Sequence, residues 1–111
     1  MWTYIGNNIR MTEGDYGVIL PIVIKGAVFQ NNDVIKITFK DAVNGTTILE
    51  QEYEPINNTV GLEFTEAESA LFPIGEYVYR IDWFRDGQFL CNITPVAGFK
   101  VFDKVCGDNH E

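Results

Sequence analysis

The sequence has very few of the side chains that hydrolytic enzymes use as nucleophiles and bases. Its one serine is Ser69 and its one histidine is His110. A serine or cysteine nucleophile needs a base within hydrogen-bond reach, and His110 belongs to a polar C-terminal stretch that we expect to be frayed. We therefore expect neither Ser69 nor Cys91 to form a catalytic pair with His110, and we predict no enzymatic activity.

Cysteine is scarce as well, with Cys91 and Cys106 as the two residues of this type. Cys91 falls within an apolar strand pattern, whereas Cys106 lies in the polar C-terminal stretch. An immunoglobulin-type bridge joins the second strand to the penultimate one, and the second expected strand has no cysteine. We therefore expect Cys91 to be buried and both residues to be free thiols, as in a reducing compartment.

Positively charged residues are also few. The chain has 8 Lys and Arg residues and 16 Asp and Glu residues, which give a formal net charge of −8. Nucleic acids and anionic membranes are bound by clustered cations. Here the cations are spread from Arg10 to Lys104, so we expect no nucleic-acid partner and no membrane partner. The negative charge favours solubility and repulsion between copies.

Long apolar runs and metal-ligand clusters are also missing. The longest apolar run, residues 17–24, is far shorter than the ~20 residues of a transmembrane helix. Residues 1–4 lack the basic region and the apolar core of a secretory signal. Cys106, Asp108 and His110 form at most a fortuitous zinc site, and neither a calcium loop nor a phosphate-binding glycine loop occurs. We therefore expect no metal and no cofactor.

What the sequence does contain is a hydrophobic period of two. In residues 35–40, Ile35, Ile37 and Phe39 alternate with polar side chains, which is typical of a half-buried strand. Asn44 and Gly45 then predict a hairpin turn with positive backbone φ angles. The pattern repeats along most of the 111 residues.

Glu50, Glu52 and Glu54 occupy every second position of the next expected strand. Their carboxylates are about 7 Å apart, because a strand rises ~3.4 Å per residue. Such a spacing suits an acid–base pair, but that chemistry also needs an apolar wall that raises one pKa. The row therefore indicates a solvent-exposed face, which also protects an edge strand from incorrect pairing.

The segment of residues 16–25 differs because its apolar side chains occupy both parities, with Leu20, Ile22 and Ile24 on one and Ile19 and Val23 on the other. A strand covered on both faces has this pattern. The cover could come from a loop, from the N-terminal arm that carries Trp2 and Tyr4, or from another molecule. An uncovered face would mark an interface, so the candidate interface residues are Trp2, Tyr4, Ile19 and Val23.

The second half of the chain predicts one helical turn and a long hairpin. Thr65 and Glu68 form a capping box, so we expect a helical turn over residues 65–71. Tyr77 follows it and is expected to be a tyrosine corner with a buried ring and a hydroxyl bonded to the backbone of residues 65–70. Asp86 and Gly87 predict a tight turn, and Pro95 with Gly98 predicts a bulge in the return strand.

About seven strands with turn signals every 8–12 residues predict an antiparallel β-sandwich, with a small closed barrel as the alternative. We expect one domain over residues 1–106 and a flexible tail over residues 107–111. The aromatic residues Tyr77, Tyr79 and Trp83 share a parity with Ile81, which favours a role in the core. A sugar-stacking platform or an interface is the other interpretation of aromatic side chains, and Phe84 is expected to be among the exposed ones.

The order of these motifs resembles the immunoglobulin-like domains of phage and prophage structural proteins, with the N-terminal domain of the phage upper baseplate protein family as the closest match. The shared elements are Gly14-Asp15 before a long apolar strand, Thr65 to Glu68, Pro73 to Tyr79, and a final strand with Gly98 and Val101. The resemblance covers residues 9–105. It implies an immunoglobulin-like fold.

The resemblance also implies a non-enzymatic virion component of a tail or baseplate, made in the bacterial cytoplasm. Its partners would be copies of itself or another tail or baseplate protein, with a homo-oligomer as one form. The alternative function is a carbohydrate-binding or adhesin-like sandwich that uses exposed aromatic side chains.

Overall fold

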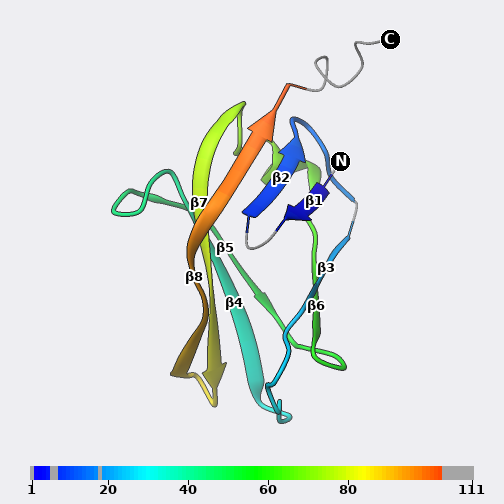
Figure 1. Ribbon diagram of the computed structural model, residues 1–111, viewed down its shortest axis with the longest axis vertical. Helices are drawn as coiled ribbons and strands as arrows, with labels where there is room; N and C mark the ends of the chain where they lie inside the picture. The colour runs from blue at the N-terminus through cyan, green and yellow to red at the C-terminus, as the bar shows by residue number, and fades with distance from the viewer. Residues whose placement is uncertain (1, 6–7, 18, 104–111) are drawn as a thin grey trace.

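The computed structural model describes residues 2–5, 8–17 and 19–103, and these residues form an all-β structure with 58% strand and 4% helix (Figure 1). The elements in chain order are β1 (Trp2–Ile5), β2 (Asn8–Thr12), β3 (Leu20–Val23), β4 (Asp33–Lys40), β5 (Thr47–Tyr53), β6 (Thr59–Leu62), α1 (Glu66–Ser69), β7 (Gly75–Arg85) and β8 (Gln88–Phe102). Strands β1 and β2 precede the first segment in which the hydrophobic pattern predicts a strand. The helix content is far below the ~30% of an average domain.

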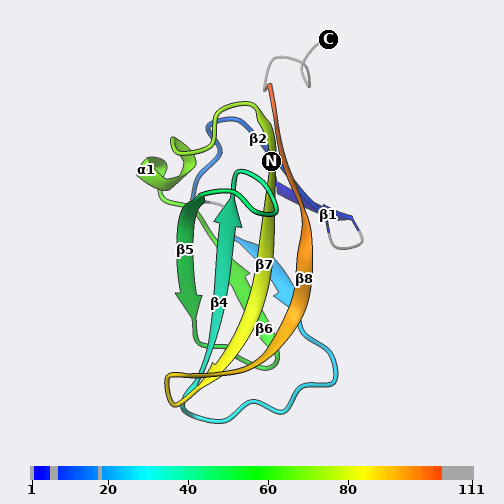
Figure 2. The same cartoon turned by 90° about the vertical axis from the view of Figure 1, so that its left-hand side faces the viewer.

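The strands form two sheets, so the sandwich prediction is confirmed and the closed barrel is excluded. The larger sheet has the order β1-β2-β8-β7-β4-β5, and the smaller one pairs β3 with β6. Figure 2 shows the smaller sheet behind the larger one. The order β8-β7-β4 and the pair β3-β6 correspond to strands G-F-C and B-E of an immunoglobulin sandwich.

One pair departs from the expected antiparallel arrangement. Strand β2 lies parallel to β8, with Ile9 opposite Phe99 and Thr12 opposite Phe102. The prediction of a wholly antiparallel sandwich is therefore wrong at this edge. A parallel pair needs a long connection between its strands, and here almost the whole domain lies between the two.

The core is built around the ring of Phe39 on β4, which is fully buried. Its centroid lies 5.3 Å from that of Phe99, 5.4 Å from that of Phe64 and 5.5 Å from that of Phe72, each at an edge-to-face angle. Aromatic pairs prefer this geometry. The cluster joins the larger sheet to the segments on either side of α1.

The helical turn begins as its sequence predicts. The Thr65 hydroxyl accepts a hydrogen bond from the Glu68 N–H at 3.1 Å, and the Glu68 carboxylate accepts one from the Thr65 N–H at 2.9 Å. This reciprocal capping box satisfies two N–H groups that the helix leaves without internal partners.

Positive φ angles occur at the expected Asp86–Gly87 turn and at the turn between β5 and β6. Asn57 and Asn58 have φ values of 53° and 62°, and Asp86 and Gly87 have 53° and 79°. The prediction for the β4–β5 turn is wrong, because neither Asn44 nor Gly45 has a positive φ angle.

The β4–β5 turn is held by a side chain instead. The Asp41 carboxylate accepts a hydrogen bond from the Thr46 N–H at 2.8 Å. A Cβ atom at Gly45 would collide with the Asp41 carboxylate. Glycine is therefore needed at this position for the close approach of Asp41 and not for its backbone angle.

The two prolines in strands lie where a missing N–H group is tolerated. Pro21 lies in β3, which is an edge strand of the two-stranded sheet. Pro95 lies at a register shift in β8, because Tyr79 pairs with Ala97 while Ile81 pairs with Thr94. Edge strands and bulges are the positions expected for proline in sheets.

Tyr77 is bonded to the backbone, but at a different residue from the one expected. Its hydroxyl donates to the carbonyl of Pro73 at 2.6 Å, and not to residues 65–70. The ring is half-buried and lies edge-on to Phe72, with centroids 5.2 Å apart. The hydrogen bond thus ties the start of β7 to the loop that leaves α1.

Tyr77→Phe is expected to lower the free energy of unfolding by about 1 kcal/mol, because it deletes the hydroxyl and leaves the Pro73 carbonyl without this donor. Urea denaturation of the two proteins measures the difference. Tyr16→Phe is the matched control, since Tyr16 is half-exposed in the β2–β3 connection. Equal midpoints for wild type and Tyr77→Phe would contradict the structural role of this bond.

Candidate functional site

The smaller sheet exposes an apolar side to solvent. Leu20 and Ile22 are buried, whereas Ile19 and Val23 are 59% and 60% exposed, and Pro21 is exposed as well. Alternate residues of a strand point to opposite sides of a sheet, so Ile19, Pro21 and Val23 share one side, called here the β3 outer face. Among the alternatives that the sequence left open for this side, the exposure of Ile19 and Val23 favours an uncovered face over cover by a loop of the described residues.

Gly61 widens the β3 outer face. It lies opposite Pro21 on β6, and a Cβ atom at Gly61 would be only 2.9 Å from Cγ2 of Ile19. The absence of a side chain at Gly61 therefore lets Ile19 lie over β6. Any larger residue at position 61 would push Ile19 aside.

Trp2 and Tyr4 belong to the other sheet. They lie on β1, whose backbone pairs with β2, with Trp2 opposite Met11 and Tyr4 opposite Ile9. Their side chains fall outside the described part of the structure. The four predicted interface residues therefore divide into two on each sheet, and Ile19 and Val23 on the smaller sheet are exposed.

The expectation that Cys91 is buried is wrong. It lies on β8 as an exposed free thiol. The smaller sheet has only two strands and leaves this part of β8 uncovered. Cys106 and His110 fall outside the described residues, and Ser69 is buried at the end of α1.

The row of glutamates forms the exposed face that its spacing predicts. Glu50, Glu52 and Glu54 are all exposed. The ammonium group of Lys36 lies 3.9 Å from the Glu50 carboxylate, and a pair this exposed contributes little to stability. Because β5 is the last strand of the larger sheet, these charges protect an open edge.

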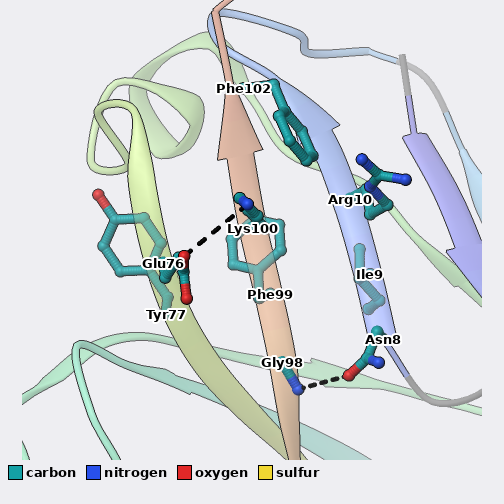
Figure 3. A pocket seen from close by; sticks show the side chains of 9 residues that line it. All are labelled: Asn8, Ile9, Arg10, Glu76, Tyr77, Gly98, Phe99, Lys100 and Phe102. Atoms are coloured by element: carbon teal, nitrogen blue, oxygen red, sulfur yellow. Dashed lines mark hydrogen bonds and ion pairs between the residues drawn. The ribbon is translucent and has the colours of Figure 1, made fainter.

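A groove of about 300 Å³ lies over β2, β8 and β7 near the opposite edge of this sheet. Figure 3 shows its lining, in which Arg10 and Lys100 come from neighbouring strands and lie close to Phe102. The Arg10 guanidinium is 4.4 Å and the Lys100 ammonium is 4.9 Å from the centroid of the Phe102 ring. Lys100 also lies 3.8 Å from a Glu76 carboxylate oxygen.

The groove combines two cations with a side-chain amide on a lining that also includes Ile9, Tyr77 and Phe99. Asn8 accepts a hydrogen bond from the Gly98 N–H at 3.0 Å, which fixes its amide on the groove wall. Cation–π contacts of this length hold a cation over an aromatic ring, so Phe102 positions both cations. The arrangement suits carboxylate groups of a bound molecule, which Arg and Lys can bind by charge-assisted hydrogen bonds.

A second charged cluster is buried and supports the fold. The Asp33 carboxylate, 1% exposed, accepts two hydrogen bonds from Arg85, Nε to Oδ1 at 2.7 Å and Nη2 to Oδ2 at 3.0 Å. The Gln30 N–H also donates to it at 2.7 Å. Hydrogen bonding to Arg85 outweighs the effect of burial and lowers the pKa of Asp33 to about 2. The pair joins the start of β4 to the end of β7.

The aromatic side chains mostly fill the core, as their parity predicts. Tyr79 and Ile81 are buried, and Trp83 packs against Phe29 with ring centroids 4.8 Å apart. Phe84, which was expected to be exposed, is half-buried beneath the Lys36 ammonium at 5.0 Å. Among the described residues, the exposed aromatic side chains are Tyr16 in the β2–β3 connection and Phe89 on β8, and these two form no row for sugar stacking.

No group of three or more His, Cys, Asp and Glu side chains in residues 2–5, 8–17 and 19–103 is placed to hold a metal ion. Within the same residues, no helix has the length and apolar character needed to cross a membrane. In comparisons with known proteins, no family model, no curated protein and no solved structure matches the chain.

Proposed function

We propose that the chain is a non-enzymatic assembly module of a phage or prophage particle, placed in the tail or baseplate and made in the bacterial cytoplasm. It acts by docking the β3 outer face on a neighbouring protein of the particle. The setting rests on the resemblance of residues 9–105 to phage structural domains, and the docking surface rests on the geometry.

The observation that carries the proposal is the exposure of Ile19, Pro21 and Val23 on one side of an edge strand. Apolar side chains that share an exposed surface mark interaction sites more often than isolated ones do. Gly61 adds to the surface because it leaves the backbone of β6 open beside Ile19. A partner that covers this face would remove the side chains of Ile19 and Val23 from water.

The net charge of −8 opposes contact between copies. Salt screens this repulsion over a Debye length of ~10 Å at 0.1 M and ~3 Å at 1 M. An apolar contact is not weakened by this screening. Docking of copies through the β3 outer face is therefore expected to tighten as salt rises.

The test replaces Ile19 and Val23 by lysine together. The mass of the purified protein is measured by light scattering over a range of concentrations in moderate salt. Binding to the purified products of the neighbouring tail genes is measured in parallel. We expect Ile19→Lys plus Val23→Lys to abolish either partner binding or the association of copies through the β3 outer face, because it places two charges in an apolar contact.

The matched control is Val28→Lys plus Ile56→Lys. These residues are 77% and 72% exposed and lie in the β5–β6 and β3–β4 connections outside the β3 outer face, Ile56 in the former and Val28 in the latter, so the control adds the same charge at comparable exposure. It is expected to behave like wild type. If neither self-association nor partner binding changes in the Ile19 and Val23 variant, the β3 outer face is not the docking surface.

A further inference from the structure

The outer face of the larger sheet carries a charge distribution unlike the rest of the molecule. This face is the side turned away from β3 and β6. Of the seven basic and fourteen acidic residues that the structure describes, the strands of this face carry five basic ones, namely Arg10, Lys36, Lys40, Arg80 and Lys100, and four acidic ones, namely Glu50, Glu52, Glu76 and Asp82. The face is therefore close to neutral in a chain of −8.

The charges on this face are also separated in space. The cations of the groove, Arg10 and Lys100, lie toward the β1–β2 edge. Glu50 and Glu52 lie on β5, which forms the opposite edge. Each zone also holds one charge of the opposite sign, because Glu76 lies 3.8 Å from Lys100 and Lys36 lies 3.9 Å from Glu50. The groove end therefore keeps a net charge of +1 and the β5 end a net charge of −1, and these are called here the cationic zone and the acidic zone.

Apolar side chains lie between the two zones. Val43, Val78 and Val96 surround a shallow depression, with Lys40 and Arg80 at its border. Val43 is 56% and Val96 is 43% exposed. The long side chain of Lys40 can cover apolar surface while its ammonium group stays in water. An apolar centre with charges at its rim is the usual composition of a protein interface.

We propose that two copies of this chain dock face to face through the outer faces of their larger sheets, with the groove of each copy over the β5 glutamates of the other. The occupant is a second copy because the two zones are complementary and belong to one surface. A two-fold axis that passes through Val43, Val78 and Val96 places the cationic zone of each copy over the acidic zone of the other. Each charge contact is then made twice, as an isologous interface requires.

This contact is independent of the proposed docking through β3. The two surfaces belong to different sheets, so a face-to-face pair leaves both β3 outer faces free. Such a pair would present two identical docking faces to the particle. Two linked faces bind more strongly than one when both can reach their sites.

The test uses two charge-reversed variants and their mixture. One variant carries Arg10→Glu plus Lys100→Glu, and the other carries Glu50→Lys plus Glu52→Lys; all four side chains are exposed. Sedimentation measures the dimer dissociation constant of each protein in reducing buffer. Each variant alone brings like charges together across the pair, so we expect its dissociation constant to rise by at least about tenfold over wild type.

Mixing the two variants in equal amounts restores opposite charges at both contacts. We expect a one-to-one pair of the two variants with an affinity close to that of the wild-type dimer. A monomeric wild type, a dimer that neither variant weakens, or a mixture that stays dissociated would each overturn the proposal. The Ile19→Lys plus Val23→Lys variant is expected to form the pair normally, so failure of the β3 proposal leaves this result unchanged.

Discussion

Phe39→Ala is expected to lower the free energy of unfolding by about 3–5 kcal/mol, which is the usual cost of truncating a buried phenylalanine. Phe39 has no exposed surface, and four aromatic rings lie within 6.2 Å of it, centroid to centroid. The cavity would open where the larger sheet meets the segments beside α1. A domain of this size has a total stability of about 5–15 kcal/mol, so the variant would be close to unfolding at 37 °C.

Chemical denaturation of wild type and variant measures this loss. Phe89→Ala is the matched control, because Phe89 is exposed beside the β7–β8 turn and surface substitutions change stability by less than about 0.5 kcal/mol. Phe39→Leu is expected to fall between the two. A loss for Phe39→Ala no larger than that for Phe89→Ala would contradict the central place of this ring.

Arg85→Leu is expected to have the second large effect, a fall in the melting temperature of about 10 °C or more. The substitution leaves the buried Asp33 carboxylate without its cationic partner. A buried charge that loses its partner is strongly destabilising. Thermal unfolding monitored by circular dichroism gives the shift, with Lys100→Leu as the control for an exposed ion pair.

The same pair makes stability depend on pH in a defined direction. Because the pKa of Asp33 is lowered from 3.8 to about 2 in the folded protein, its contribution is fully present above pH 4 and is lost as the pH falls toward 2. Arg85→Leu raises this pKa, so this part of the acid-induced loss should disappear. A variant that loses stability between pH 4 and pH 2 as steeply as wild type would contradict the assignment.

Features that depend on neighbouring residues could be predicted from the sequence. The capping box of Thr65 and Glu68 needs residues three apart, and the Asp86–Gly87 turn needs two adjacent ones. The alternation of Ile35, Ile37 and Phe39 also identified one face of β4 correctly. Each of these signals is contained in a few residues, so no knowledge of the tertiary structure was required.

Features that depend on distant residues could not be predicted. Asp33 and Arg85 are 52 residues apart, and no local pattern marks them as partners. Cys91 lies in an apolar pattern, yet it is exposed because the smaller sheet has only two strands. Whether Cys91 is covered depends on the number of strands in the smaller sheet, and the hydrophobic period does not reveal that number.

The charged groove also could not be predicted, because it is formed by residues that are distant in the sequence. In the sequence, Arg10 and Lys100 are ninety residues apart and look dispersed. The parallel pairing of β2 with β8 places them opposite each other. The β3 outer face was closer to prediction, because Ile19 and Val23 occupy one parity of a single segment, and only the absence of a cover was unknown.

The parallel pairing of β2 with β8 also determines how the domain would respond to mechanical tension. If the chain were pulled at residues 2 and 103, the antiparallel pair of β1 and β2 would open one hydrogen bond at a time. The force would then reach the ladder from Ile9–Phe99 to Thr12–Phe102 along the strand direction. In a parallel pair pulled from opposite ends, the bonds are loaded in shear and must break together, so this ladder resists extension far better than the hairpin before it.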